Sequence, residues 1–330
     1  MPPQPTPSSQ PALALRSAAQ CTIEQLTHAF NRGFEGYAIP ITQTPDTLQR
    51  MIDDNDVRLE QSLVAAAPDG ELVGVGLLAL RGNAADRAAD ATIDATTDDA
   101  VETEAEAGLR AWIGGMGIAP AWRGKGQGAG LLRALIAQAS GRHATHIQLE
   151  VLADNVPAHL LYARFGFHET RTLTVYTGVA HMPKRRRQPA PAATFRQLVV
   201  AEALALFDAY HPAQPSWQRE QATLRHMAQR LEAIGMEDES GGSETSGLRA
   251  YALISRQPTG YAILDLGSRA ASAVDRKADA LGLLDELLRR FPGALLRAIN
   301  VVPGEPLGDA LQAAHCTVVT TQREMQLPLL

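Results

Sequence analysis

A short segment from Gly117 to Gly130 combines glycines at alternate positions with two basic side chains. The alternating glycines are Gly124, Gly126, Gly128 and Gly130. Such a run cannot form a stable helix interior, but it lets the backbone adopt unusual dihedral angles and approach a ligand closely. A helix is expected to begin near Gln127, so its free N–H groups point into the segment, where Arg123 and Lys125 add positive charge. This pattern indicates a cradle for a pyrophosphate; the alternative is a glycine-rich turn that binds nothing.

Two common phosphate-binding motifs, the Walker A loop and the dinucleotide fingerprint, can be compared with this segment. A Walker A loop requires glycine where this sequence has Ala119, and serine or threonine where it has Gly126. A dinucleotide fingerprint is formally present from Gly124 to Ala129, but it requires an acidic residue at the end of the next strand. Glu150 is at roughly the right distance and falls inside that strand instead. The sequence therefore argues against a P-loop and leaves a dinucleotide-dependent oxidoreductase as an alternative.

A second group of polar residues follows the strand expected over residues 147–152. Asn155 and Tyr162 are seven residues apart around a predicted short helix, so two helical turns separate them and they share one face. Each also has a purely structural interpretation. Asn155 precedes a helix with Pro157 in its first turn and can simply cap it, and Tyr162 can be a half-buried packing residue.

Together, the two regions resemble the GNAT superfamily of N-acetyltransferases. The first motif reads R-x-x-G-x-G over residues 123–128 and is preceded by Gly-Ile-Ala-Pro at 117–120. The second motif covers residues 149–167. Its residues in register are Asn155, Ala158, Tyr162, Gly166 and Phe167. The resemblance extends over residues 21–178, and the two motifs together are specific, whereas either alone is weak.

The resemblance implies acetyl-CoA as the cofactor and gives the loop a role. Backbone N–H groups of the loop hold the pyrophosphate of coenzyme A. The cofactor-binding residues implied here are Arg123, Gly124, Lys125, Gly126, Gln127 and Gly128. Asn155 hydrogen-bonds the cofactor, and Tyr162 protonates the departing thiolate as a general acid.

The strand before the loop is the second part of the implied cofactor site. In GNAT proteins this strand diverges from its neighbour at a bulge, and the pantetheine arm lies between the two. The backbone of Met116, Gly117 and Ile118 binds the arm and helps to polarise the acetyl carbonyl. Gly114 and Gly115 suit a bulge or a close backbone approach.

Acyl transfer to an amine requires the neutral amine, so a base or a water chain must accept the ammonium proton. Glu150 is the first candidate for this base because it lies on the strand expected beside the acyl group; an ordinary strand carboxylate is the alternative. Glu35 and Tyr37 fall where GNAT proteins place substrate-recognition residues. The sequence has no cluster with metal-ligand spacing, so we expect no metal.

The organisation of the chain follows from its composition breaks. Residues 1–14 are rich in Pro, Ser and Gln and are expected to be disordered, and residues 15–180 form the catalytic domain. Within that domain, residues 83–108 are read as a mobile acidic loop. Residues 181–193 combine basic residues with Pro and Ala and are read as a linker, and residues 194–330 form a second domain.

The second half repeats the element order of the first, which indicates two similar domains of about 150 residues. The hairpin expected over residues 249–266 is matched to the one over residues 62–80. Helices are expected over residues 195–209 and 217–234. The predicted fold class is α/β (α+β), with two tandem acyl-CoA N-acyltransferase-like domains, each a mixed, mainly antiparallel sheet with helices on both faces.

The cofactor motifs are missing from the second half. It has no R-x-x-G-x-G segment, and matching the helices puts Glu305 opposite Asn155 and Gln312 opposite Tyr162. We therefore expect that this domain does not bind acetyl-CoA productively, packs against the first and completes the substrate cleft.

Charge and hydropathy exclude several other classes. The formal net charge of -6 gives no basic field for nucleic acid, and no apolar stretch is long enough to span a membrane. The N-terminus lacks a secretion-signal pattern, and only Cys21 and Cys316 occur, so a cytoplasmic location is expected. The leading function is acetyl transfer from acetyl-CoA to a primary amine of a small molecule. A non-catalytic acyl-CoA-binding module is a further alternative, and the oligomeric state is open.

Overall fold

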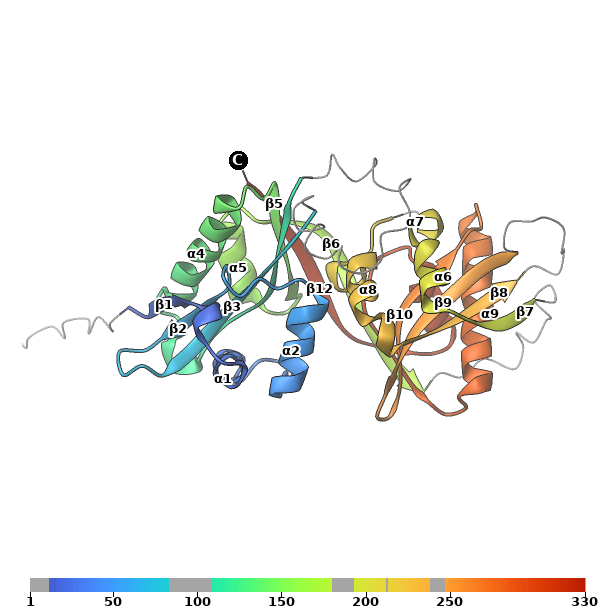
Figure 1. Cartoon of the computed structure of the whole chain (residues 1–330), viewed down its shortest axis with the longest axis horizontal. Coiled ribbons are helices and arrows are strands. Elements are labelled where there is room, and N and C mark those ends of the chain that lie inside the picture. The colour runs from blue at the N-terminus through green and yellow to red at the C-terminus, as the bar shows by residue number, and fades with distance from the viewer. Residues whose placement is uncertain (1–11, 83–107, 180–192, 212, 238–246, 330) are drawn as a thin grey trace, which may run out of the picture. The chain divides into compact units, whose positions relative to one another are not determined.

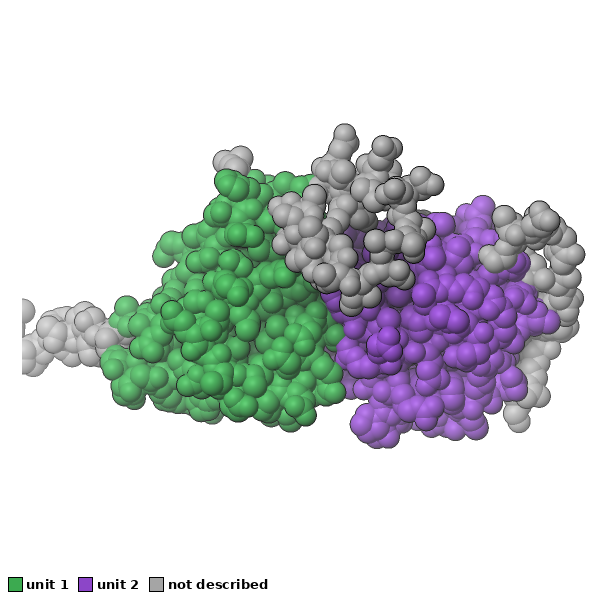
Figure 2. Space-filling model, in the orientation of Figure 1, with its two compact units in different colours: residues 1–150, 160–168, 325–330 green, residues 151–159, 169–324 purple. Residues whose placement is uncertain are grey.

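The computed structural model describes residues 12–82, 108–179, 193–211, 213–237 and 247–329. It divides into two compact units (Figure 2). The first unit comprises Met1–Glu150, Leu160–His168 and Met325–Leu330, and the second comprises Val151–His159 and Glu169–Glu324. The predicted acidic loop and the predicted linker lie almost entirely outside the described residues. At the end of the predicted disordered terminus, Leu13 is buried and Ala14 begins a strand.

The first unit contains strands in the order β1-β2-β3-β4-β5 (Figure 1). The strands are β1 (Ala14–Ser17), β2 (Leu63–Ala66), β3 (Leu72–Arg81), β4 (Arg110–Ile118) and β5 (His146–Leu152). The helices are α1 (Ile23–Gly33), α2 (Pro45–Asp54), α4 (Gln127–Gly141) and α5 (Val156–Arg164), the last of which is divided between the units. Neighbouring strands run antiparallel except β4 and β5, which run parallel.

Local sequence signals explain where the first helices begin. Thr22 and Gln25 form a capping box at the start of α1, and Thr44 and Thr47 do the same for α2. These helices carry apolar residues on one face. Helices lie on both sides of the sheet, because the β4 face at Gly115 meets α1 whereas the opposite face of β3 meets α4.

The second unit contains strands in the order β12-β6-β11-β10-β9-β8-β7. The strands are β6 (His168–Val179), β7 (Thr194–Leu198), β8 (Leu231–Glu237), β9 (Leu248–Gln257), β10 (Gly260–Ser268), β11 (Leu295–Val301) and β12 (Thr317–Pro328). The helices are α6 (Val200–Ala205), α7 (Phe207–Tyr210), α8 (Gln221–Met227), α9 (Ala273–Arg290) and α10 (Pro306–Ala313). Buried side chains of α9 and α10 pack with those of the central strands in one apolar core. The predicted fold class is confirmed.

The division of the chain differs from the predicted contiguous domains: Val151–His159 and most of β6 belong to the second unit, and Met325–Leu330 belongs to the first. β6 follows α5 in sequence and was assigned to the first domain, yet it pairs antiparallel with β11, from Leu295 opposite Val179 to Val301 opposite Thr174. Backbone pairing therefore places β6 in the second unit, although no composition break precedes it.

Three expectations for the second half are corrected. The helix expected from residue 195 begins only at Val200, because Thr194–Leu198 pairs with β8 as β7. The helix expected over residues 217–234 ends before Leu231, where β8 begins. The hairpin β9–β10 precedes the long helix α9, so its counterpart in the first half is β3–β4, not residues 62–80.

Among the described residues, no helix combines the length and the hydropathy needed to cross a membrane.

Candidate functional site

The strands β4 and β5 separate halfway along their length. Their parallel register runs from Arg110 opposite His146 to Ile113 opposite Leu149 and stops there, while β4 continues to Ile118. At the same point the register of β4 with β3 jumps by one residue at Gly114, which is a β-bulge. Beyond the bulge, the β4 edge that faced β5 presents backbone groups to whatever lies between the strands.

Glycines beyond the bulge allow close packing on the α1 side. A Cβ on Gly115 would lie 3.3 Å from the Phe30 ring, and one on Gly117 would lie 2.7 Å from the Gly33 carbonyl oxygen. Side chains at these positions would force α1 away from β4. The Phe30 ring stacks on Phe34 at a centroid distance of 4.4 Å, so aromatic side chains cover this part of β4.

The glycine loop at the start of α4 has the geometry expected of an anion cradle. Gly124 and Gly126 have φ angles of 73° and 79°, in the left-handed region that favours glycine. A Cβ at either position would meet nothing within 4 Å. Gly126 is the N-cap of α4 and supplies no side-chain cap, so the first N–H groups of the helix are available to a ligand. The space and the donors fit a pyrophosphate.

Two side chains of this loop form hydrogen bonds with the backbone of other segments. The Arg123 guanidinium donates to the carbonyl oxygens of Ile118, Gly33 and Glu35 at 2.7, 3.0 and 2.7 Å. The Gln127 side-chain oxygen accepts from the Leu13 amide at 3.2 Å. The Arg123 guanidinium faces backbone carbonyls, and the expectation that its charge contributes to the cradle stays a prediction.

The predicted acid Tyr162 is buried and packs against Phe167. Its ring is 5.8 Å from that of Phe167, and only 6% of the residue is exposed. Burial, and to a smaller extent the neighbouring Tyr37, raises the pKa of Tyr162 well above its usual value of 10. Tyr162 therefore keeps its proton at neutral pH. Tyr37 also meets Phe34 edge-on, at a centroid distance of 5.4 Å.

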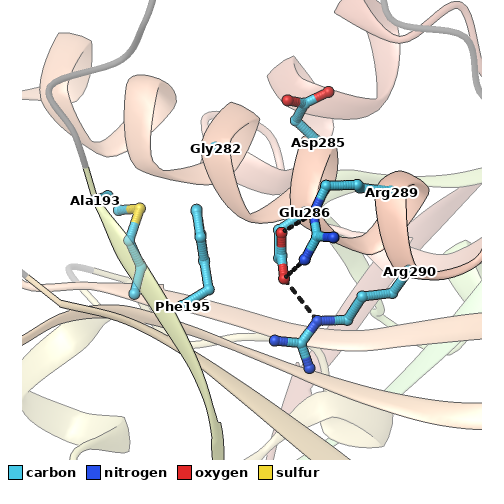
Figure 3. Close-up of a pocket in the computed structure, with 8 residues that line it drawn as sticks. Ala193, Phe195, Gly282, Asp285, Glu286, Arg289 and Arg290 are labelled. Atoms are coloured by element: carbon cyan, nitrogen blue, oxygen red, sulfur yellow. Dashed lines mark hydrogen bonds and ion pairs between the residues drawn. The ribbon is translucent and has the colours of Figure 1, made fainter.

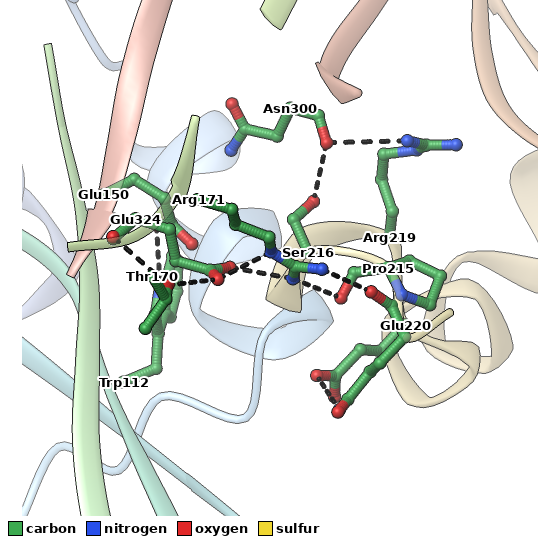
Figure 4. Close-up of polar contacts among 11 residues, drawn as sticks. Trp112, Glu150, Thr170, Arg171, Pro215, Ser216, Arg219, Glu220, Asn300 and Glu324 are labelled. Atoms are coloured by element: carbon green, nitrogen blue, oxygen red, sulfur yellow. Dashed lines mark hydrogen bonds and ion pairs between the residues drawn. The ribbon is translucent and has the colours of Figure 1, made fainter. Parts of the chain in front are cut away.

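Glu150 is held by a residue that sequence analysis did not single out. The Trp112 indole N–H donates to the Glu150 carboxylate at 2.7 Å (Figure 4). A Cβ on Gly114 would lie 2.4 Å from the indole ring, so Trp112 covers the bulge. Its only sequence signal is a tryptophan two residues before the glycine pair. Glu35 is exposed, and its carboxylate is paired with Arg32.

Asn155 caps α5, as the alternative interpretation of this residue predicted. Its side-chain oxygen accepts from the Ala158 amide at 3.3 Å. Asn155 belongs to the second unit and Tyr162 to the first, although both lie at α5. The cofactor role of Asn155 stays a prediction.

The second unit contains an equivalent separation of strands with different contents. The parallel register of β10 and β11 stops at Ala262 opposite Arg297, and β10 is bulged at Leu264. Beyond that point Arg219, which is 1% exposed, donates to the Leu264 carbonyl at 2.7 Å. It also donates to the Asn300 carbonyl at 3.5 Å (Figure 4). One guanidinium therefore bridges the two diverging strands.

A buried charge network surrounds Arg219. It donates to Glu305 at 2.6 Å and lies 3.9 Å from Asp265, which also accepts from His211 at 2.9 Å and Tyr251 at 2.9 Å. Burial lowers the pKa of His211, but the charge and hydrogen bond of Asp265 outweigh burial and raise it above 6.5. The reciprocal effect of His211 outweighs burial for Asp265 and lowers its pKa below the usual value.

A cavity of about 500 Å³ in the second unit is unrelated to these residues. Phe195, Met236 and α9 line it, and Arg289 and Arg290 there are both bonded to Glu286 (Figure 3). None of the predicted site residues lines it. Within the described ranges, no group of acidic, His and Cys residues could hold a metal ion.

Comparisons with known proteins agree with this geometry. The sequence model of the acetyltransferase (GNAT) family matches residues 23–167. No protein of curated function matches the sequence. The fold resembles that of a GCN5-related N-acetyltransferase from Sphaerobacter thermophilus, with 15% identity, a TM-score of 0.63, and coverage of 96% of this chain and 95% of that chain.

Two further solved structures share the fold. A tandem GNAT protein from the clavulanic acid biosynthesis pathway has 15% identity and a TM-score of 0.63, with 96% and 98% of the two chains covered. A glucosamine N-acetyltransferase region of a fungal multi-domain GH3 β-N-acetylglucosaminidase has 14% identity and a TM-score of 0.68, with 96% and 38% covered. The fold is one that supports acyl transfer, and residues 23–167 match the model of the acetyltransferase (GNAT) family.

Proposed function

We propose that the first unit transfers an acetyl group from acetyl-CoA to a primary amine of a small molecule. One observation carries the proposal: the glycine cradle of α4 follows directly on the strand whose edge is freed where β4 leaves β5. A cradle alone would fit many phosphates. A freed strand edge beside it fits a ligand that carries both a pyrophosphate and amide groups, as coenzyme A does.

Each residue would have a distinct part in the reaction. Acetyl-CoA supplies an activated thioester. The N–H groups at the start of α4 bind its pyrophosphate, and the backbone of Met116, Gly117 and Ile118 binds its amide-containing arm. Backbone N–H groups at the bulge stabilise negative charge on the carbonyl oxygen as the amine attacks. The buried Tyr162 hydroxyl gives its proton to the thiolate that leaves.

The test compares two glycine replacements of equal strain and charge. Gly126 and Gly70 are both exposed, both have positive φ (79° and 90°), and a Cβ on either would meet nothing within 4 Å. Gly126→Glu places a carboxylate in the cradle, whereas Gly70→Glu places it in the β2–β3 turn. Calorimetric titration with acetyl-CoA should give one site per chain in the wild type and in Gly70→Glu, and none in Gly126→Glu.

The same titration separates the alternatives. Binding of NAD instead of acetyl-CoA would replace the proposal with a dinucleotide-dependent activity. Thiol release from acetyl-CoA, measured with a panel of primary amines (2-phenylethylamine, putrescine and glucosamine), tests turnover. Binding without release by any amine of a broader panel would favour the non-catalytic module.

A further inference from the structure

We propose that Arg123 is a positioning residue that ties the cofactor cradle to the turn carrying Glu35 and Tyr37, so that the acceptor side of the site is held in place relative to the cradle. The inference rests on the proposed function for its kinetic consequence. Its structural part, the link between the loop and the turn, stands on the hydrogen bonds of Arg123 alone.

The three carbonyls that Arg123 binds belong to three different elements. Ile118 ends β4, Gly33 ends α1, and Glu35 lies in the turn that follows α1. Arg123 itself lies between the short helix Pro120–Trp122 and the glycines of the cradle. The guanidinium therefore links the start of the cradle to the end of β4, to the end of α1 and to the turn that follows α1.

The turn after α1 is a compact unit that transmits such a constraint. The amide of Glu35 donates to the Arg32 carbonyl and that of Tyr37 to the Phe34 carbonyl, at 3.4 and 3.0 Å. Gly36 has a φ of 70°, which closes the turn. Tyr37 in turn lies close enough to Tyr162 to affect its pKa. The turn that Arg123 ties to the cradle therefore carries Tyr37, whose ring packs edge-on against Phe34.

Only arginine can make this set of bonds. Its planar guanidinium has five N–H donors in a fixed fork, whereas a lysine ammonium is a compact charge on a flexible stem. Gly33 also offers one of the last carbonyls of α1, which have no partner within the helix and which a cation satisfies well. Arg123 is exposed, so replacing it leaves the apolar core intact.

The experiment compares Arg123→Lys with Lys125→Gln. The first keeps the charge and loses the fork. The second removes a charge beside the cradle, where Lys125 bonds the Ala121 carbonyl, and leaves the fork. Hydrogen exchange of the peptide over residues 33–40 should quicken about tenfold in Arg123→Lys and stay at the wild-type rate in Lys125→Gln. This readout needs neither cofactor nor turnover.

Kinetics with acetyl-CoA and whichever amine of the panel is turned over complete the test. Arg123→Lys should raise the KM for the amine about tenfold, a typical size for coupled sites, with the Kd for acetyl-CoA within about twofold. Lys125→Gln should raise the Kd instead. Unchanged exchange over residues 33–40, or a raised Kd with an unchanged KM, would overturn the proposal. A lowered melting temperature in Arg123→Lys with an unchanged KM would assign Arg123 a purely structural role and overturn it too.

Discussion

The two pairs of diverging strands, β4–β5 in the first unit and β10–β11 in the second, share a backbone plan and differ in what lies between the strands. Both pairs run parallel for three or four residues, and in both the strand before the long helix is bulged where the pairing stops, at Gly114 and Leu264. In the first unit the residues after the bulge are glycine-rich. In the second unit Arg219 bonds both strands.

The comparison shows that one backbone plan can hold different groups between its diverging strands. The position after the bulge is Gly115 in the first unit and the buried Asp265 in the second. A buried carboxylate requires compensating partners, and Arg219, His211 and Tyr251 supply them from within the unit. The protein's own ion pairs and hydrogen bonds therefore occupy the place where the two strands of the second unit diverge.

The largest effect, on the stability of the second unit, is expected from removing Arg219, which bonds both diverging strands. Arg219→Ala leaves the largely buried Glu305 without its cation and removes one of the partners of Asp265, a change that typically costs about 3–5 kcal/mol of unfolding free energy. Hydrogen exchange of β10 and β11 peptides, followed against urea, measures the loss. Arg256→Ala is the matched control: this arginine pairs with Glu232 at 70% side-chain exposure and should cost about 1 kcal/mol or less.

Acetyl-CoA binding sharpens the same experiment. Because the cradle lies in the first unit, Arg219→Ala should still bind one acetyl-CoA per chain with the wild-type Kd. A second binding site in Arg219→Ala would mean that the arginine alone blocks the second unit. Loss of the first site would contradict the independence of the two sites.

The next largest effect is expected at Tyr162. Tyr162→Phe removes the proton donor but keeps the buried ring, so turnover should fall about 10²–10³-fold with an unchanged Kd for acetyl-CoA. Tyr176→Phe is the control, because Tyr176 is an equally buried tyrosine of the second unit whose hydroxyl accepts from Gln312 at 2.9 Å. It should leave turnover at the wild-type level. Equal turnover in both variants would remove Tyr162 from the mechanism.

The raised pKa of Tyr162 adds a condition to that experiment. Since the hydroxyl stays protonated above its usual value of 10, turnover should not decline with deprotonation of Tyr162 at any pH up to 10. A loss of turnover below pH 10 that disappears in Tyr162→Phe would show that burial does not hold the proton.

The sequence predicted the first unit better than the second for a physical reason. Glycines at 124 and 126 must occupy the left-handed region that other residues rarely adopt, so residue type alone reports the loop conformation. The hydrophobic periodicity of α4 and the caps of α1 and α2 are equally local. Signals of this kind do not depend on what the segment packs against.

The missed features depend on contacts between distant residues. Leu231–Glu237 is β8 because it pairs with β7 and β9, yet its sequence also fits the end of a helix. Arg219 reads as an ordinary surface charge, and its burial is visible only once Leu264, Asn300 and Glu305 surround it. The sequence around Trp112 indicates only a core residue. Its hydrogen bond to Glu150 is visible only once β4 and β5 are known to be neighbours.

A smaller effect is expected from removing the hydrogen bond between Trp112 and Glu150. Trp112→Phe keeps an aromatic ring over Gly114 and removes the hydrogen bond to a largely buried carboxylate, which should cost about 1–3 kcal/mol of unfolding free energy. If Glu150 is the general base, its misplacement should also lower kcat. Trp217→Phe, at a buried tryptophan of the second unit, should leave kcat unchanged. A wild-type kcat in Trp112→Phe would favour the strand-carboxylate interpretation of Glu150.

The smallest effect is expected from pH, and it belongs to the second unit. The pKa of His211 is raised in the folded state, so its contribution to stability is complete below about pH 6.5 and is lost as the pH rises through the raised value. The pKa of Asp265 is lowered, so its contribution is present above about pH 3.9 and is lost as the pH falls through its folded value. The second unit should therefore be most stable between these limits.

Urea unfolding followed by hydrogen exchange of β10 peptides, at pH values from 5 to 9, measures this slope. His211→Gln removes the titrating group and should flatten the decline above pH 6.5, whereas His28→Gln, an exposed histidine of the first unit, should not change it. A slope that survives in His211→Gln would mean that another group titrates. A slope of opposite sign would mean that burial, not Asp265, dominates the pKa of His211, and the ion pair that distinguishes the second unit from the first would then be neutral.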